Sequence, residues 1–227
     1  LDLFPESFEH PSINCGYADL NKALPVESGT VDFVFCQEGI EHVSDQPAAL
    51  RELSRILKPT GKLLITTPNP SNLRSRISHL LGESEHYKLM PPNELDTIWL
   101  SKDKDQEENI YYGHTFLIGF PKLRFLARLA GFSVQEIYYD RTNNLSVALL
   151  PLLYPWIALT AFTSYRRALR KRQDISPAIK KTVYREVLKA AIDPRNLIVS
   201  HIFIEFEKTS SAQAAVRELR ASNKLSS

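Results

Sequence analysis

The sequence has few of the residues that would mark a cofactor loop, a disulfide framework or a nucleic-acid surface. Only eight glycines occur among 227 residues, and none are spaced as in a G-x-G-x-G loop. Two cysteines, Cys15 and Cys36, cannot form a disulfide framework, so a reducing, cytosolic setting is favoured. A formal net charge of +2 gives no general indication of nucleic-acid binding. With 43% hydrophobic residues, the chain can bury one sizeable core.

Residues 31–69 predict a strand–helix–strand unit, and hence an α/β sheet. The helix has its leucines on one face, Ser44 or Asp45 as its cap, and Pro47 in its first turn. The first strand is nearly continuous in apolar residues, which is typical of a strand buried on both faces of a parallel sheet. The expected elements are a strand over Val31–Cys36, a helix over Gln46–Leu57, a turn over Lys58–Gly61 and a strand over Leu63–Thr67.

Polar side chains follow both strands of this unit. In open α/β sheets, ligands bind beyond the carboxyl ends of the strands, so chemistry is expected there. The residues in question are Gln37, Glu38, Glu41 and His42 after the first strand, and Asn69 after the second.

At these residues the sequence resembles the class I S-adenosylmethionine-dependent methyltransferases. It is most similar to the branch of the ubiquinone-biosynthesis O-methyltransferases and the small-RNA 2′-O-methyltransferases. The resemblance covers roughly residues 1 to 140, with Leu197–Lys208 as a plausible final strand, and Thr60 stands where the family usually has a second glycine. Its motifs are Leu24-Pro25, the strand at 31–36, Glu41-His42, Arg51-Glu52, Arg55-Ile56-Leu57-Lys58-Pro59, Gly61 and Pro68-Asn69.

This resemblance implies a Rossmann-like α/β sheet that is mostly parallel and has an antiparallel last strand. The family's glycine-rich cofactor loop is not found in the sequence, and the first residue is Leu1 rather than Met. We therefore expect that the first strand and the loop were cut away; the alternative is a degenerate homologue.

The resemblance also assigns cofactor-binding residues for S-adenosylmethionine. Asp2 would accept hydrogen bonds from the ribose hydroxyls, although a solvated residue near the terminus is the alternative. Asp19 would meet the adenine amino group and Leu20 would pack on the ring, although Asp19 could instead cap a turn. Gln37, at the end of the first strand, completes the expected cofactor set.

The Glu38-x-x-Glu41-His42 pattern predicts a catalytic or metal-binding site. Carboxylate and imidazole ligands suit a divalent ion such as Mg, Mn or Zn. The resembling subfamily adds a later His, here His114, so the expected metal ligands are Glu38, Glu41, His42 and His114. Without a metal, His42 could serve as general base, with Glu41 as the second catalytic residue. A structural role, with Glu41 capping a helix, is the third alternative.

An uncharged run over Leu145–Phe162 is followed by five basic residues. A helix of roughly 18 residues would extend about 27 Å, slightly short of a bilayer core, and Pro151 and Pro155 should break it. We therefore expect a monotopic or re-entrant membrane contact over residues 145–172, with Tyr154 and Trp156 at the interface. A buried helix, a dimer face and a pocket wall are the alternatives. The basic residues are Arg166, Arg167, Arg170, Lys171 and Arg172.

The remaining segments complete a single methyltransferase domain over residues 1–208, with a hydrophobic and basic helical insertion over 141–195. The expected elements are an irregular, substrate-covering segment over Ser71–Glu108, a helix over Phe120–Leu129 closed by Gly131, a strand over Ser133–Tyr139, a helix over Ile175–Ile192, a strand over Asn196–Glu207 and a polar, mobile tail over 209–227.

These features predict a methyltransferase that uses S-adenosylmethionine, with a divalent metal such as Mg as a further expected group. The acceptor would be an oxygen on a lipid-soluble or lipid-linked molecule, such as a quinone precursor or a glycan. The location would be cytoplasmic, peripheral at the inner face of a membrane. The alternatives are an RNA 2′-O-methyltransferase, although a nucleic-acid partner is not expected, and a non-catalytic scaffold with this fold. The acceptor's identity and the oligomeric state stay open.

Overall fold

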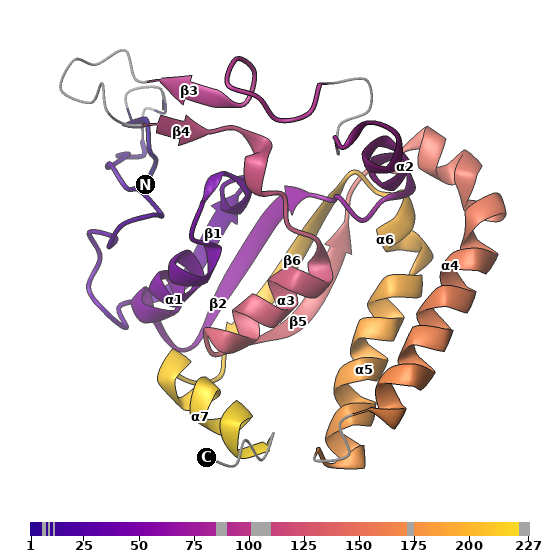
Figure 1. The fold of residues 1–227 in the computed structure, drawn as a ribbon. Helices are drawn as coiled ribbons and strands as arrows, with labels where there is room; N and C mark the ends of the chain where they lie inside the picture. Colours follow the sequence, from indigo (N-terminus) through magenta and orange to yellow (C-terminus); the bar gives the residue numbers. More distant parts are fainter. Residues whose placement is uncertain are drawn as a thin grey trace.

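The computed structural model describes residues 1–5, 8, 10, 12–84, 90–100, 110–171 and 175–222. Its strands are β1 (Val31–Gln37), β2 (Leu57–Pro68), β3 (Ile98–Leu100), β4 (Ile110–Tyr112), β5 (Phe132–Tyr139) and β6 (His201–Lys208) (Figure 1). Its helices are α1 (Gln46–Ile56), α2 (Leu73–Gly82), α3 (Phe120–Leu129), α4 (Asn144–Arg170), α5 (Pro177–Ile192), α6 (Pro194–Ile198) and α7 (Ala212–Ser222), with short 3-10 turns η2 (Ile40–His42) and η4 (His114–Phe116).

The main sheet has the strand order β1-β2-β6-β5. β1 and β2 pair in parallel, whereas β6 is antiparallel to both of its neighbours, β2 and β5. Three strands therefore run in one direction and the last strand of the chain opposes them. The predicted α/β sheet, mostly parallel with an antiparallel last strand, is confirmed.

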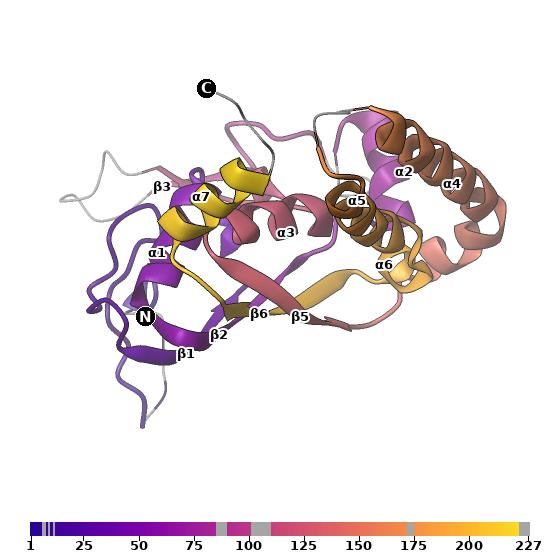
Figure 2. The ribbon, with the colours of Figure 1, turned by 90° about the horizontal axis from the view of Figure 1, so that it is seen from below.

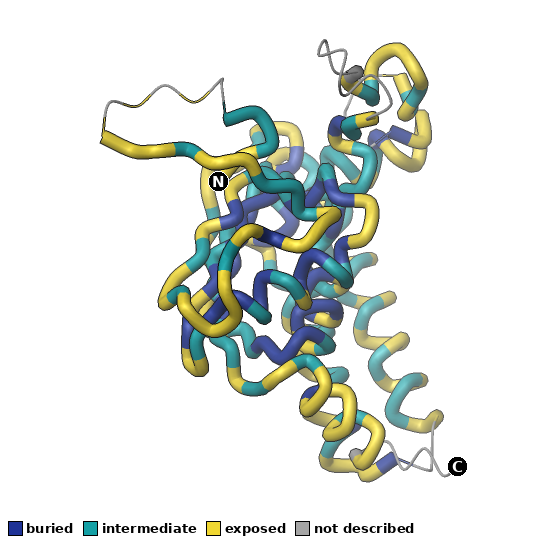
Figure 3. The backbone as a smooth tube through the Cα atoms, turned by 90° about the vertical axis from the view of Figure 1, so that its left-hand side faces the viewer, coloured by how far each residue is buried: buried dark blue, intermediate teal, exposed yellow. Residues whose placement is uncertain are grey.

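Helices α1, α3 and α5 lie over one face of this sheet (Figure 2). The side chains on that face form the core, and Ile65, Ile204 and Phe206 are fully buried there. Buried residues gather in the middle of the molecule (Figure 3). The prediction that β1 is buried on both faces is wrong, because Phe33 and Phe35 are 52% and 49% exposed on the opposite face. In the described part of the chain, no helix lies over that face of β1.

The β1-α1-β2 unit forms as the sequence predicts. Asp45 caps α1 by accepting a hydrogen bond from the Ala48 N–H at 2.9 Å, and proline occupies the first turn. Leu50 and Leu53 are almost completely buried against the core. The amphipathic pattern of α1 therefore decides which of its faces meets the sheet.

The sequence predicted a turn over residues 58–61 before the second strand. In the structure these residues instead form an irregularity within β2. The register of β1 against β2 shifts between the pairs Val31–Leu57 and Phe33–Lys62. Thr60 lies within this irregular stretch, and its backbone adopts the left-handed conformation with φ of 63°. This conformation suits glycine and is strained for a β-branched residue.

Residues 71–108 are more regular than the loop that the sequence predicted. They contain α2, capped by Asn72 through a hydrogen bond from the Ser75 N–H, and the strand β3. β3 pairs with β4 in a separate two-stranded sheet. Residues 85–89 and 101–109 of this segment lie outside the described residues.

The end of α3 and the C-terminal segment are joined at Gly131. The predicted helix over Phe120–Leu129 and its glycine terminator are confirmed, with Gly131 at φ of +90°. The Gly131 carbonyl accepts hydrogen bonds from the backbone N–H groups of Thr209 and Ser210. α7 follows directly, with Ala215 buried. A mobile tail from residue 209 was therefore a wrong prediction, because the described part of this segment is anchored and helical.

The insertion before the last strand differs from the prediction in two ways. α4 is one helix of 27 residues, so Pro151 and Pro155 bend it without ending it (Figure 1). The final strand begins at His201 rather than at Asn196, because Asp193 caps the short helix α6 by accepting from the Arg195 N–H.

Replacing Thr60 with glycine should stabilise the fold by about 1 kcal/mol, because the left-handed conformation costs an L-residue roughly that much. Thr60 is exposed, so little packing is lost. Chemical denaturation of both proteins measures the difference. The matched control is Gly61→Ala, which should destabilise, because a Cβ there would lie 2.9 Å from the Lys58 carbonyl oxygen. If the Thr60→Gly protein were no more stable than the parent protein, the inferred backbone strain at Thr60 would be wrong.

Candidate functional site

A pocket of about 530 Å³ lies along β1 and the N-terminal segment. All four residues that the sequence assigned to the cofactor line it: Asp2, Asp19, Leu20 and Gln37. His42 and Glu38 lie on its wall as well. The carboxyl end of β1 therefore faces this pocket, as expected for an α/β sheet.

Backbone hydrogen bonds bring Asp2 and Asp19 to the same pocket. The Asp2 N–H donates to the Gly16 carbonyl at 3.0 Å, and the Ala18 N–H donates to the Asp2 carbonyl at 2.8 Å. Each carboxylate also supports a local turn: Asp2 Oδ1 accepts from the Phe4 N–H, and Asp19 Oδ1 accepts from the Asn21 N–H. The capping role considered for Asp19 thus occurs together with its place on the pocket wall.

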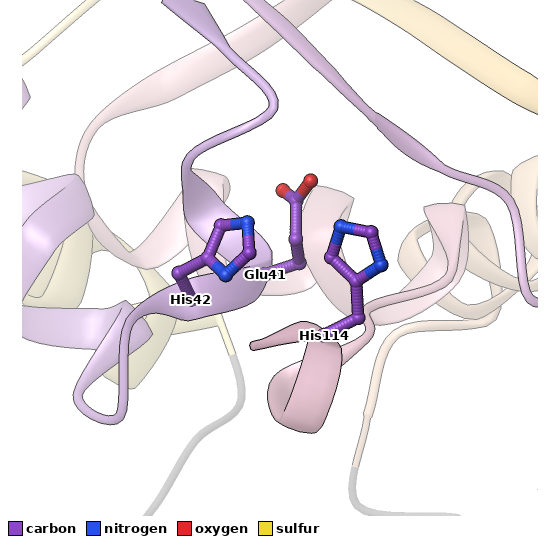
Figure 4. A group of neighbouring side chains, drawn as sticks. All are labelled: Glu41, His42 and His114. Atoms are coloured by element: carbon purple, nitrogen blue, oxygen red, sulfur yellow. The ribbon is translucent and has the colours of Figure 1, made fainter. Parts of the chain in front are cut away.

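Glu41, His42 and His114 converge on one point next to this pocket. The ligand atoms that these three residues offer all lie within 4.8 Å of one another. The two imidazole rings flank the Glu41 carboxylate, with Glu41 and His42 on η2 and His114 on η4 (Figure 4). His42 and His114 are 72 positions apart in the sequence, and the contact between the two 3-10 turns brings them together.

His42 is held in one orientation by the backbone of β4. Its Nδ1 lies 2.8 Å from the Tyr112 carbonyl oxygen. A carbonyl can only accept, so Nδ1 carries the proton and Nε2 keeps its lone pair. Its ring lies 5.0 Å from the His114 ring and 5.4 Å from the Trp99 ring, measured between centroids. This arrangement leaves Nε2 able to bind a metal or accept a proton.

Glu41 is the most constrained member of the cluster. It is fully buried, its Oε2 accepts from the Thr67 hydroxyl at 3.1 Å, and its Oε1 has no hydrogen-bond partner in the described structure. Burial raises the pKa of this carboxyl, and the charge of Glu38 raises it further. A buried, unpartnered carboxylate oxygen between two imidazoles has the chemistry of a metal ligand.

Glu38 does not join this cluster in the structure, so its role as a ligand beside Glu41 stays a prediction. Its backbone has φ of 44°. Its Oε2 lies 3.6 Å from His201 Nε2 instead.

Asn69, expected to take part in chemistry, has a structural role. Its Nδ2 donates to the Asn196 carbonyl at 2.8 Å and to the Val199 carbonyl at 3.2 Å. The carboxamide is buried, and Oδ1 accepts from the Ser71 N–H.

Three residues at the site were not predicted: Thr67, Trp99 and the carbonyl of Tyr112. Thr67 ends the second strand of the predicted unit, so its position at the site could have been inferred from the strand. Trp99 lies on β3, a strand that no pattern in the sequence indicated. Burial raises the pKa of the nearby Cys36 thiol to about 12, so this residue stays protonated and is a poor ligand.

The part of the chain that forms this pocket matches a known family. The family model described as methyltransferase domain matches residues 4–65, which include β1, α1 and most of β2. Over residues 4–65 the chain is therefore similar to a methyltransferase domain. This methyltransferase segment contains Asp19, Leu20, Gln37, Glu41 and His42, whereas His114 lies beyond it.

Relatives of the methyltransferase segment include two enzymes of quinone biosynthesis. The ubiquinone biosynthesis O-methyltransferase of Xanthomonas oryzae pv. oryzae is 33% identical over an alignment of 94 residues that covers 37% of this chain and 39% of that protein. The ubiquinone/menaquinone biosynthesis C-methyltransferase UbiE of a Shewanella species is 42% identical over 53 residues, 23% of this chain and 21% of that protein. The chain thus matches less than half the length of these relatives.

Two solved structures are similar in shape. One is a SAM-dependent methyltransferase from Archaeoglobus fulgidus, with TM-score 0.46, 15% identity, and coverage of 89% of this chain and 71% of that one. The other is an S-adenosylmethionine-dependent methyltransferase from Mesorhizobium loti, with TM-score 0.41, 11% identity, and coverage of 87% and 71%. At these values neither similarity bears on the activity.

Glu41→Gln should stabilise the protein at neutral pH when a chelator is present. The raised pKa means that the folded state binds more protons than the unfolded state between the two pKa values, so stability falls as pH rises through that window. The variant removes this loss, and the two proteins should converge below the unfolded pKa. Thermal unfolding at several pH values measures the effect.

Glu52→Gln is the matched control. Its hydrogen bond from Arg55 lowers the pKa of Glu52, so this carboxylate stabilises the fold above its unfolded pKa and the variant should be less stable at neutral pH. If both variants were less stable than the parent protein, the inference that burial of the Glu41 carboxylate destabilises the fold would be wrong.

Proposed function

We propose that this chain forms part of an enzyme that transfers a methyl group from S-adenosylmethionine to an oxygen atom. The observation that carries the proposal is the pocket on which Asp2, Asp19, Leu20, Gln37 and His42 all lie. The methyltransferase family of residues 4–65 supports the cofactor. The acceptor is proposed to be lipid-soluble or lipid-linked, such as a quinone precursor or a glycan, and the name of the Xanthomonas relative supports the quinone precursor.

Without a bound metal, His42 is the residue proposed to take the acceptor's proton. Bound S-adenosylmethionine would supply an electrophilic methyl group. As the oxygen–carbon bond forms and the carbon–sulfur electron pair stays on sulfur, the hydroxyl proton would pass to His42 Nε2. The hydrogen bond from Nδ1–H to the Tyr112 carbonyl leaves the lone pair on Nε2 and holds the ring in place.

A divalent metal fits Glu41, His42 and His114, and we propose it as the alternative in which His42 Nε2 is a ligand and not the base. The unpartnered Oε1 of Glu41 and two neighbouring imidazoles are a mixed oxygen and nitrogen donor set. Such a set suits Mn or Zn better than Mg, which prefers oxygen ligands and water. A bound ion would lower the pKa of an acceptor hydroxyl.

Asp2→Ala should weaken binding of S-adenosylmethionine by about 1.5–3 kcal/mol, the range for hydrogen bonds to a charged group. Isothermal calorimetry on the protein at its natural length measures it. Asp32→Ala is the matched control, because it removes an exposed carboxylate that pairs with Lys58 and does not line the pocket. Equal affinity in the Asp2 variant and the unchanged protein would refute the ribose assignment.

His114→Ala should weaken Mn or Zn binding at least about tenfold, because it removes a ligand. Metal content after dialysis and calorimetry with the metal alone give a readout that does not depend on activity. Chelation should also abolish transfer, and Mn or Zn should restore it. Glu38→Gln, which removes a carboxylate of the same motif outside the cluster, should retain metal binding.

Full transfer activity after chelation would remove the metal from the proposal and leave His42 as a metal-free base. Loss of metal binding in Glu38→Gln, with His114→Ala unaffected, would contradict the cluster itself.

A further inference from the structure

The outward face of α4 is apolar over most of its length. An 18-residue window of this helix has a mean hydropathy of 1.8, and only 6% of it is buried. Exposed side chains on one side include Leu152 at 67% and Trp156 at 66%, with Leu159 and Phe162 further along. The neighbouring helix α2 also exposes Leu80 and Leu81. A contiguous apolar surface of this kind marks an interaction site.

The opposite side of α4 packs against α5, which is charged on its own outer surface. Both views show the two helices side by side (Figures 1 and 2). Lys181, Arg185 and Lys189 of α5 are exposed. If α4 crossed a bilayer, α5 would be carried into the hydrocarbon with these charges, at a large cost in free energy. Its length alone, about 40 Å at 1.5 Å per residue, would permit a crossing.

The two prolines give a second reason against a crossing. Pro151 and Pro155 have no N–H, so the carbonyls of Val147 and Pro151 lack their α-helical partners. Val147 and Pro151 are exposed. In a spanning helix such carbonyls need a neighbouring helix, a hydroxyl side chain or water as partner, and at exposed residues the interface between lipid and water supplies that water. α4 therefore suits a position in the plane of a membrane surface.

The end of α4 is basic. Arg166, Arg167, Arg170 and the following Lys171 are exposed, and the helix contains no acidic residue. Basic residues beside an inserted apolar face complement anionic headgroups. Arg172 lies outside the described residues.

We propose that α4 docks in the plane of an anionic lipid surface, with Leu152, Trp156 and Leu159 among the acyl chains and its arginines at the headgroups. α5 stays on the aqueous side and carries the domain. This docking does not depend on the methyl transfer, so its test leaves the proposed reaction untouched.

The depth of Trp156 distinguishes docking from crossing. The chain has two tryptophans, so in a Trp99→Phe background Trp156 is the sole tryptophan reporter. Vesicles of phosphatidylcholine and phosphatidylglycerol, brominated either near the headgroup or near the chain end, should quench its emission. Strongest quenching by the shallow bromines is expected. Trp156 lies near the middle of the helix, so strongest quenching by the deep bromines would overturn the in-plane position.

Paired substitutions test which residues of α4 bind the lipid surface. Leu152→Asp with Trp156→Asp should weaken sedimentation with the anionic vesicles at least about 100-fold. Arg167→Gln with Arg170→Gln should weaken it about 30-fold, since each basic residue near the surface contributes about fivefold. The control is Phe125→Asp, which replaces a 55% exposed residue of α3 and should bind normally.

All variants should keep the unfolding temperature of the parent protein, since the substituted residues are exposed. Three results would overturn the proposal: a collapse of thermal stability in the Leu152/Trp156 variant, equal loss of vesicle binding in the Phe125 control, or no binding by the parent protein. A dimer that sediments without vesicles and dissociates in the Leu152/Trp156 variant would assign the face to a second copy of the chain.

Discussion

The hydrogen bonds around Asn69 fix the point at which the sheet, the insertion and the site meet. The Asn69 N–H donates to the Ser200 carbonyl at 2.8 Å, and its carbonyl accepts from Asn72 Nδ2 at 2.7 Å. Asn72 lies beside the buried Ser146 hydroxyl, which accepts from the Arg74 N–H at 3.0 Å. These groups are buried, so each would carry a desolvation cost if its partner were lost. The network therefore determines where α2 begins and where α4 leaves the sheet.

The local patterns of the sequence predicted the elements that depend on neighbouring residues. The capping of α1 by Asp45 and the termination of α3 at Gly131 can each be recognised from a few neighbouring residues. The convergence of Glu41 and His42 with His114 could be expected only from the family resemblance, because no spacing rule links positions so far apart. The structure supplies what joins them, which is the Tyr112 carbonyl that orients His42.

Other features depend on tertiary contacts or on the backbone of one residue, and the sequence did not predict them. Proline ends many helices, yet α4 continues through Pro151 and Pro155 and packs against α5 along its inner side. Glu38 has the right residue type for a ligand, but its carboxylate lies beside His201. The apolar run of β1 indicated burial on both faces, although half of the Phe33 side chain is exposed. Pattern identifies which side chains prefer burial, whereas the rest of the fold decides what covers them.

The position of β6 between β2 and β5 has a consequence for folding during synthesis. β6 is the last strand along the chain, but it is an interior strand of the sheet. β2 and β5 therefore have no connection within the sheet until residue 208 has left the ribosome. At roughly 5–20 residues per second, the β1-β2 pair waits on the order of ten seconds for this partner, with an unpaired edge. We infer that α1, which contacts β2, covers one face of the β1-β2 pair during that interval while the edge of β2 stays open.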